Sequence, residues 1–290
     1  MESIEKHCKL RYSAFSFHFI RHLHYFYTTI SFFTEQTRSQ LALKDELRQQ
    51  GDFLFKHRGW LPIPFVFIGL LIFMERIEDR QGWFDELWLS KEYTFVCLGI
   101  GLMGLAIRAI TIGATPKNTS GRNTHGQVAD DLNTTGVYSI VRHPLYVGNF
   151  FMWISIVLLT QDWGFTLSFL LAYWLYYERI MYAEEAFLIE KFGDKYLDWA
   201  ARTPAFIPDF RKWKSAELTF SVKNILKREY TGLFLLLTIF TLFNAAGNWM
   251  LRGEFYPSPV WMIILIIAIS SYLILRTLAK YTKVLYVDGR

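Results

Sequence analysis

Residues 230–251 read YTGLFLLLTIFTLFNAAGNWML, a stretch without one charged side chain. A bilayer with a hydrocarbon core of about 30 Å takes about 20 apolar residues in a helix, so this stretch predicts a transmembrane span. A second uncharged stretch, from Phe255 to Leu275, follows almost at once. These two stretches decide the fold class, because they predict a membrane protein built from helices.

Four further apolar stretches predict additional spans. In chain order the six expected spans are Trp60–Ile77, Tyr93–Gly113, Tyr146–Thr160, Trp163–Tyr182, Tyr230–Trp249 and Pro259–Leu278. The third is short, and only Gln161 and Asp162 separate it from the fourth, so this pair predicts a tight helical hairpin. Soluble core helices are the alternative for the pair. We therefore expect an all-α, polytopic membrane protein with about six transmembrane helices.

The composition agrees with this fold class. Of all residues, 52% are hydrophobic and 18% aromatic, and the mean hydropathy of +0.18 is more apolar than is typical of soluble domains. The net charge of +5 would permit nucleic-acid binding, but the basic residues are spread between apolar blocks and no known binding module accompanies them. The only two cysteines, Cys8 and Cys97, exclude a disulfide scaffold and a cysteine metal cluster.

The positions of Lys and Arg predict the orientation. Alternate segments hold 26 of the 31 basic residues, namely 1–59, 114–143, 178–229 and 276–290. Positively charged connections stay on the cytoplasmic side of a membrane, so both termini are expected in the cytoplasm. The protein is then a multi-pass integral membrane protein.

Three parts of the chain are expected. They are an N-terminal cytoplasmic or interfacial segment (1–59), a core of four spans (60–212) and a C-terminal extension with two further spans (213–290). The N-terminal segment lacks the pattern of a signal peptide, so we expect it to be retained.

Histidines in the N-terminal segment suggest one alternative role. Ala14–Phe33 mixes aromatic and basic residues, as a helix lying in the membrane interface does. His18 and His22 are one helical turn apart and His24 is near, a spacing that suits a metal. No carboxylate or cysteine lies close to them, so no metal site is predicted.

Two polar segments border the short hairpin. Residues 134–148, TTGVYSIVRHPLYVG, lead into its first helix, and residues 178–196 lead out of its second. Pro144 suits the first turn of a helix, where its missing N–H costs nothing. Because the two helices run antiparallel, the polar ends of both segments should meet on the cytoplasmic side.

The expected meeting point carries charge of both signs. Arg142 and His143 should lie beside Glu184 and Glu185. Arginine binds a carboxylate through two hydrogen bonds, and glutamate accepts from an ammonium or a ribose hydroxyl, so the cluster suits a zwitterionic ligand. The alternative is a structural salt-bridge cluster that anchors the helix ends at the interface.

Several short motifs follow one another in a fixed order across roughly residues 95–210. They are RHPLYVG at 142–148, EE at 184–185, FG at 192–193, Tyr196 and RTPAFIP at 202–208. Their order and spacing resemble the isoprenylcysteine carboxyl methyltransferase and phospholipid methyltransferase family of integral membrane enzymes. The resemblance leaves out the N-terminal segment and the last two spans.

The resemblance implies a cytoplasmic site for S-adenosylmethionine. It implies catalytic roles and cofactor contacts for Arg142, His143, Glu184 and Glu185. It also implies that the cofactor is bound by Tyr138, Tyr146 and Gly148, and by the earlier pair Gly99 and Gly101. Arg202 also comes near this pocket or else faces the membrane surface. No metal is implied.

The expected reaction moves a methyl group to a lipid-like or membrane-delivered acceptor, a carboxylate, thiol or amine. The acceptor is a lipophilic small molecule or a lipidated one, and it approaches from the bilayer. The protein mainly aligns the acceptor and excludes water. Only an amine or a hydroxyl needs a base, and a glutamate or His143 would serve. The sequence identifies neither the acceptor nor the oligomeric state.

Two other functions remain open at this stage. Membrane sterol reductases share the helical arrangement and use NADPH. Their sequences resemble an RHxNY pattern at the first motif, and they have basic residues where this chain has Glu184 and Glu185. A non-catalytic transport or interaction protein is the second alternative. Transporters bury charged or broken helices at mid-membrane, whereas here Arg108 lies near the cytoplasmic end of its span.

Overall fold

Helices form all the regular secondary structure in the part of the chain that the structure describes. A computed structural model describes residues 42–78, 91–116 and 127–289. Its α-helices are α2 (Leu43–His57), α3 (Ile63–Glu78), α5 (Lys91–Gly113), α6 (Pro144–Leu158), α7 (Trp163–Phe192), α8 (Asp194–Ala200), α9 (Val222–Arg252) and α10 (Pro259–Tyr281). The short 3₁₀ helices are η1 (Val137–Ser139) and η2 (Phe210–Lys212). The all-α class is confirmed for these residues.

The expected spans coincide with six described helices, α3, α5, α6, α7, α9 and α10. Three of them are long and apolar enough to cross a membrane: α5 from Glu92 onward, α9 and α10. Helix α6 is apolar but shorter. Six spans and cytoplasmic termini stay predictions. Most of the N-terminal segment, with Ala14–Phe33 and its histidines His18, His22 and His24, lies outside the described residues.

The second helix of the predicted hairpin, α7, has well-defined ends. Asp162 caps its start by accepting the N–H of Phe165 at 2.6 Å, and it also pairs with Arg76 of α3. The helix continues past the expected span end at Tyr182 and stops before Gly193, whose φ of 54° suits glycine. The polar end of the hairpin is therefore one continuous rod that projects beyond the span.

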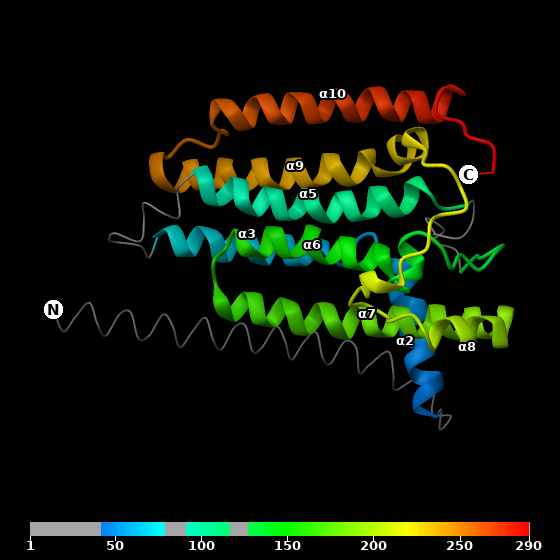
Figure 1. Cartoon of the computed structure of the whole chain (residues 1–290). Helices are drawn as coiled ribbons and strands as arrows, with labels where there is room; N and C mark the ends of the chain where they lie inside the picture. The colour runs from blue at the N-terminus through cyan, green and yellow to red at the C-terminus, as the bar shows by residue number, and fades with distance from the viewer. Residues whose placement is uncertain (1–41, 79–90, 117–126, 290) are drawn as a thin grey trace. The chain divides into compact units, whose positions relative to one another are not determined.

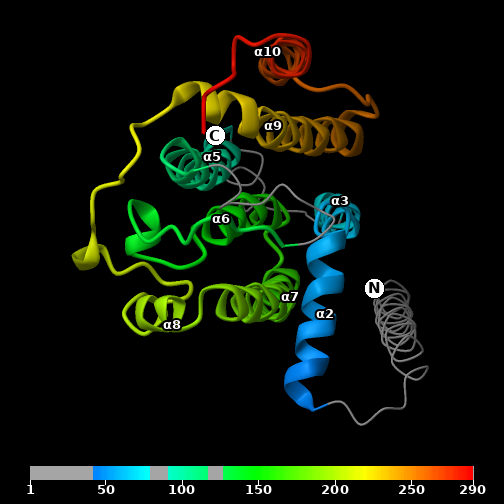
Figure 2. The same cartoon turned by 90° about the vertical axis from the view of Figure 1, so that its right-hand side faces the viewer.

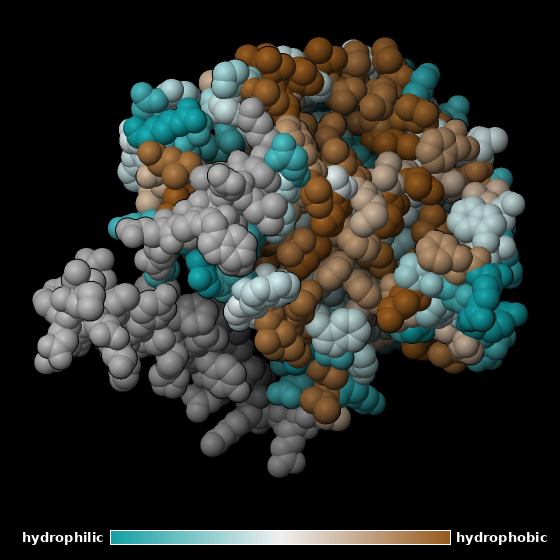
Figure 3. Space-filling model, turned by 60° about the vertical axis from the view of Figure 1, so that its left-hand side comes forward, coloured by the Kyte–Doolittle hydropathy of each residue, from teal (hydrophilic) through white to brown (hydrophobic). Residues whose placement is uncertain are grey.

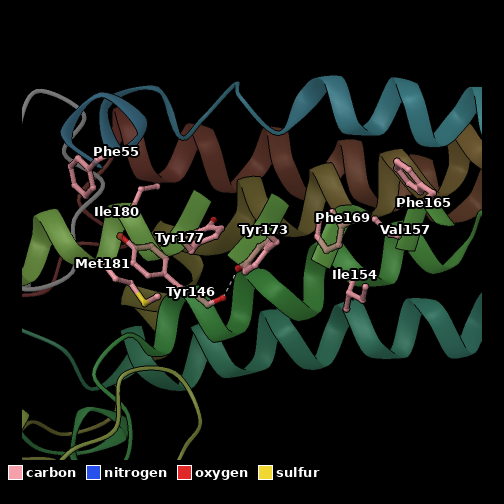
Figure 4. Packing of buried hydrophobic residues seen from close by; sticks show 10 residues of the cluster. All are labelled: Phe55, Tyr146, Ile154, Val157, Phe165, Phe169, Tyr173, Tyr177, Ile180 and Met181. Carbon is pink, nitrogen blue, oxygen red and sulfur yellow. Dashed lines mark hydrogen bonds between the residues drawn. The ribbon is translucent and has the colours of Figure 1, made fainter. Parts of the chain in front are cut away.

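The long helices lie side by side (Figure 1), and an end-on view shows α6 between α5 and α7 (Figure 2). Helix α9 packs against α5, α3 and α10. Buried residues of α5, α6, α9 and α10 share one apolar cluster: Cys97, Leu98, Ile156, Leu159, Leu236, Phe240, Phe243 and Trp261. A second cluster, rich in tyrosine and phenylalanine, joins α2, α6 and α7 (Figure 4). Helix α6 is thus packed on both sides.

Large hydrophobic side chains remain exposed on the outer helices. On α7 they include Leu171, Trp174 and Leu175, and on α10 they include Ile263 and Ile267. Figure 3 shows hydrophobic residues across much of one face, with hydrophilic residues near its margins. Soluble proteins rarely expose a continuous apolar patch beyond a few hundred Å², so these surfaces suit contact with lipid.

Helices α5 and α6 approach closely where Gly104 faces Gly148. A Cβ atom added to Gly104 would lie 2.5 Å from the Gly148 carbonyl oxygen and 2.7 Å from the Met152 nitrogen. Small residues permit such close crossings between membrane helices. The crossing brings α5 against the first turns of α6, directly after the RHP motif.

Gly104→Ala is expected to lower the unfolding temperature of the detergent-solubilised protein. The new methyl group would meet backbone atoms of α6, and overpacking of this kind costs about 1–3 kcal/mol. Gly99→Ala is the matched control, because a Cβ at Gly99 on the same helix meets nothing within 4 Å. Equal unfolding temperatures for the two variants would contradict the close crossing.

Candidate active site

Backbone hydrogen bonds to a later segment hold Arg142 and His143 in place. The N–H of Arg142 donates to the carbonyl of Pro204 at 2.9 Å, and the N–H of His143 donates to that of Ala205 at 3.2 Å. Pro144 then begins α6. Both side chains therefore start from a backbone that is fixed on two sides, by the helix and by the 204–205 segment.

Two carboxylates on α7 face this backbone. His143 Nε2 lies 2.9 Å from Glu185 Oε1, and His143 Nδ1 lies 3.6 Å from Glu184 Oε2. Arg142 Nε lies 3.3 Å from the same oxygen of Glu185. The structure brings these four residues together, as the antiparallel hairpin predicted. We call this group the charged cluster.

The charged cluster is largely shielded from water, and its pKa values reflect its pairing. Burial lowers the pKa of His143, but hydrogen bonds and charges from Glu184 and Glu185 outweigh it and raise the pKa above its usual 6.5. Burial raises the pKa of Glu185, but His143 and Arg142 outweigh it and hold the pKa below its usual 4.5. The pairing thus favours a protonated histidine, with both ring nitrogens facing carboxylates, beside an ionised glutamate.

Buried donors without hydrogen bonds lie beside the charged cluster. They are Arg142 Nε and the Tyr196 hydroxyl, which both interact with Glu185, and Trp199 Nε1. Thr238 Oγ1 is the one other such side-chain atom among the described residues. Tyr196 interacts electrostatically with Arg142 and Glu185, and its ring lies 5.5 Å from that of Trp199. An unsatisfied buried group costs about 1–3 kcal/mol, so these donors suit a ligand that carries hydrogen-bond acceptors.

Tyr146 separates the charged cluster from the aromatic core. Its ring stacks on that of His143 with 5.7 Å between centroids and lies 4.7 Å from that of Tyr177. The Tyr173 hydroxyl donates to the Tyr146 carbonyl at 2.7 Å (Figure 4). The Tyr146 hydroxyl interacts electrostatically with Glu184. Tyr146 therefore connects the packed aromatic core to the charged cluster.

The remaining predicted site residues fall into two groups. Tyr138, in η1, interacts electrostatically with Glu184, so it belongs beside the cluster. Gly148 lies at the crossing of α5 and α6, where an added Cβ would come within 2.5 Å of Arg108 Cγ. Its close packing supports a role in shaping the site, and contact with a cofactor stays a prediction.

Gly99 and Gly101 are not brought to the charged cluster. Gly101 packs against Ser155 of α6 and Leu236 of α9, and Gly99 is exposed. Ser155 lies about 18 Å beyond His143 along the axis of α6, at 1.5 Å per residue. The glycine at 101 serves helix packing, and no contact on the described residues supports a cofactor role for either glycine.

Sequence reasoning assigned no role to two residues that the structure brings to the site. Tyr196 belongs to the motif series at 142–208 but has no role predicted from the sequence, and Trp199 belongs to no motif. Their spacing of three residues places both on one face of α8, which was the available signal. Arg202 is exposed and bonds to the Asp198 carbonyl, so its side chain is not part of the charged cluster.

Comparisons with known proteins agree with these features. A family model described as phospholipid methyltransferase matches residues 93–195. Protein-S-isoprenylcysteine O-methyltransferase B of Arabidopsis thaliana is 31% identical over 144 residues, which cover 49% of this chain and 70% of that protein. The protein-S-isoprenylcysteine O-methyltransferase of Schizosaccharomyces pombe is 40% identical over 78 residues, 27% of this chain and 33% of the relative. No solved structure matches the chain.

Another relative has a different kind of name. The cobalt-zinc-cadmium resistance protein CzcN of Cupriavidus metallidurans is 29% identical over 210 residues, 69% of this chain and 89% of that protein. Within residues 42–78, 91–116 and 127–289, no group of three or more His, Cys, Asp or Glu side chains is arranged to hold a metal ion.

The apolar helices and the matched region define a membrane methyltransferase. The chain belongs to the isoprenylcysteine carboxyl methyltransferase and phospholipid methyltransferase family. The family match spans α5, α6, α7 and the start of α8, so it contains the whole charged cluster.

The paired His143 predicts a pH-dependent stability. Folding raises the pKa of His143, so its pairing stabilises the fold fully below about pH 6.5 and is lost as the pH rises through the raised pKa. Above pH 6.5 the unfolding temperature of the cofactor-free protein should therefore fall more steeply than that of His143→Gln, which cannot become charged. Parallel temperature profiles would contradict the pairing. The pairing of Glu185 acts in the other direction, and its contribution is lost as the pH falls below about 4.5.

Proposed function

We propose that the protein is an S-adenosylmethionine-dependent methyltransferase whose acceptor is lipid-like or delivered by the membrane. The observation that carries the proposal is the charged cluster, in which Arg142 and His143 meet Glu184 and Glu185 at the junction of α6 and α7. Family membership supports methyl transfer. The cofactor and the acceptor are inferred from the chemistry of the cluster.

The residues around the cluster fit the polar groups of S-adenosylmethionine. A carboxylate on the cofactor is a suitable acceptor for the buried donors Arg142 Nε, the Tyr196 hydroxyl and Trp199 Nε1. The carboxylates of Glu184 and Glu185 suit an ammonium group or ribose hydroxyls, because they are strong acceptors. We assign cofactor contact to Arg142, His143, Glu184 and Glu185, with Tyr138, Tyr146 and Gly148 around them.

When bound, S-adenosylmethionine supplies a methyl group on a sulfonium, and displacement of that methyl leaves a neutral thioether. The protein aligns the acceptor and keeps water out. Glu184 and Glu185 face both ring nitrogens of His143 and raise its pKa, which favours its action as a proton donor over its action as a proton acceptor. The site therefore suits an acceptor that arrives without a proton, a carboxylate or a thiolate, better than it suits an amine.

We place the charged cluster on the cytoplasmic side of a six-span protein with both termini inside. The distribution of Lys and Arg supports this orientation. Exposed apolar residues on α7, such as Leu171 and Leu175, support entry of the acceptor from the bilayer. The division into residues 1–59, 60–212 and 213–290 belongs to the same proposal.

Arg142→Ala and Glu185→Ala are each expected to weaken binding of S-adenosylhomocysteine by about 100-fold or more. Removing one partner of a buried charged hydrogen bond costs about 2–5 kcal/mol. Glu190→Gln is the matched control, since Glu190 lies on the same helix but is exposed and pairs with Arg48. The measurement is binding to the purified protein, with an unfolding scan to check folding.

Two results would reject this assignment. Wild-type-like binding in both alanine variants would show that the charged cluster does not hold the cofactor. A wild-type protein that binds reduced nicotinamide cofactor, and does not bind S-adenosylhomocysteine, would favour the reductase alternative.

Methyl transfer from labelled S-adenosylmethionine is expected into lipophilic carboxylates or thiols. Prenylated peptides with a free carboxylate, fractionated membrane lipids and water-soluble thiols would be compared as acceptors. Because the acceptor enters from the bilayer, a prenylated peptide should accept at least tenfold more label than the same peptide without its prenyl group. Equal labelling of the two peptides would contradict a lipid-side approach.

A further inference from the structure

A second polar group of residues lies inside the bundle, on four different helices. Arg108 of α5 donates from Nε and Nη2 to the two oxygens of Glu229 on α9, at 2.8 Å and 2.7 Å. Its Nη1 donates to Asn149 Oδ1 on α6 at 2.6 Å. Asn149 Nδ2 in turn donates to the Tyr177 hydroxyl on α7 at 3.0 Å. We call these four residues the relay, because one chain of hydrogen bonds joins them.

The relay is buried and charged. The Glu229 side chain is 6% exposed and that of Arg108 is 21% exposed. Ionisable residues inside a membrane bundle are expensive, so they are kept mainly where function needs them. Glu229 lies beyond the matched residues 93–195, on the helix that begins the last two spans. The relay thus connects the C-terminal extension to the family core.

One end of the relay reaches the charged cluster. The Tyr177 ring lies 4.7 Å from that of Tyr146, and the Tyr146 ring stacks on that of His143 at 5.7 Å. The other end depends on Gly148, since a Cβ there would come within 2.5 Å of Arg108 Cγ. A residue of the RHPLYVG motif therefore leaves the space through which Arg108 reaches Asn149 and Glu229.

We propose that Glu229 is a positioning residue for the methyltransferase site. Its carboxylate fixes the Arg108 guanidinium, which orients the Asn149 amide toward Tyr177. Tyr177 then fixes the Tyr146 ring, and with it the plane of His143 in the charged cluster. The proposal rests on the proposed function, because its effect is defined by cofactor binding and methyl transfer.

Glu229→Gln removes the charge but keeps the shape of the side chain, so Arg108 loses its ion pair and the relay loosens. We expect the unfolding temperature to fall and the dissociation constant for S-adenosylhomocysteine to rise about tenfold. The same loss of order at His143 should lower kcat in methyl transfer. These effects alone would also follow from a general loss of stability.

The double variant Arg108→Met with Glu229→Leu separates positioning from stability. Replacing a buried ion pair by apolar residues of similar volume is often neutral or stabilising, so the unfolding temperature should return toward that of the wild type. Asn149 still lacks its arginine partner, so binding of S-adenosylhomocysteine should remain about tenfold weak. A double variant that regains both stability and affinity would overturn the positioning role and leave a structural one.

Arg76→Met is the matched control for breaking an ion pair between helices. Arg76 of α3 pairs with Asp162 at the start of α7, at the opposite end of that helix from Glu185. The Arg76→Met variant should have a lower unfolding temperature than the wild type, while its dissociation constant for S-adenosylhomocysteine stays within twofold of the wild-type value. A tenfold rise in this control would show that affinity follows stability, and would reject the proposal. A wild-type protein that binds no S-adenosylhomocysteine would reject the proposed function and the positioning role together.

Discussion

The Glu185 carboxylate binds Arg142 and His143 at once, and the arrangement of the site depends on this shared contact. A charge removed from water needs a partner of opposite sign at short range. To meet this requirement, α7 must extend far enough to carry Glu185 to the site, and the chain before α6 must place Arg142 and His143 beside it. The same requirement operates deeper in the bundle, where Arg108 is matched by Glu229.

The charged cluster could be predicted because it follows from connectivity. Two apolar stretches separated by Gln161 and Asp162 must run antiparallel, so the residues at their outer ends become neighbours. No knowledge of side-chain packing is needed for that step. The ends of α7 were less predictable, since hydropathy marks the end of a span near Tyr182 but not the end of the helix, which continues to Phe192.

Packing between distant segments could not be predicted in the same way. The donors of Tyr196 and Trp199 reach the site only because α8 folds back after Gly193, and their patterns in the sequence resemble those of any amphipathic helix. Gly99 and Gly101 show the reverse case. Their spacing matches a cofactor motif, yet small residues have the same spacing where helices pack, and Gly101 meets Ser155 and Leu236.

The pairing of Arg108 with Glu229 also bears on how the chain enters the membrane. The two residues are 121 positions apart, so the ribosome delivers α5 long before α9. In that interval Arg108 has no glutamate partner, and a long arginine side chain near a helix end then extends toward the lipid headgroups. Arrival of α9 lets the guanidinium withdraw into the bundle. A helix that is synthesised much later therefore completes the packing around Arg108.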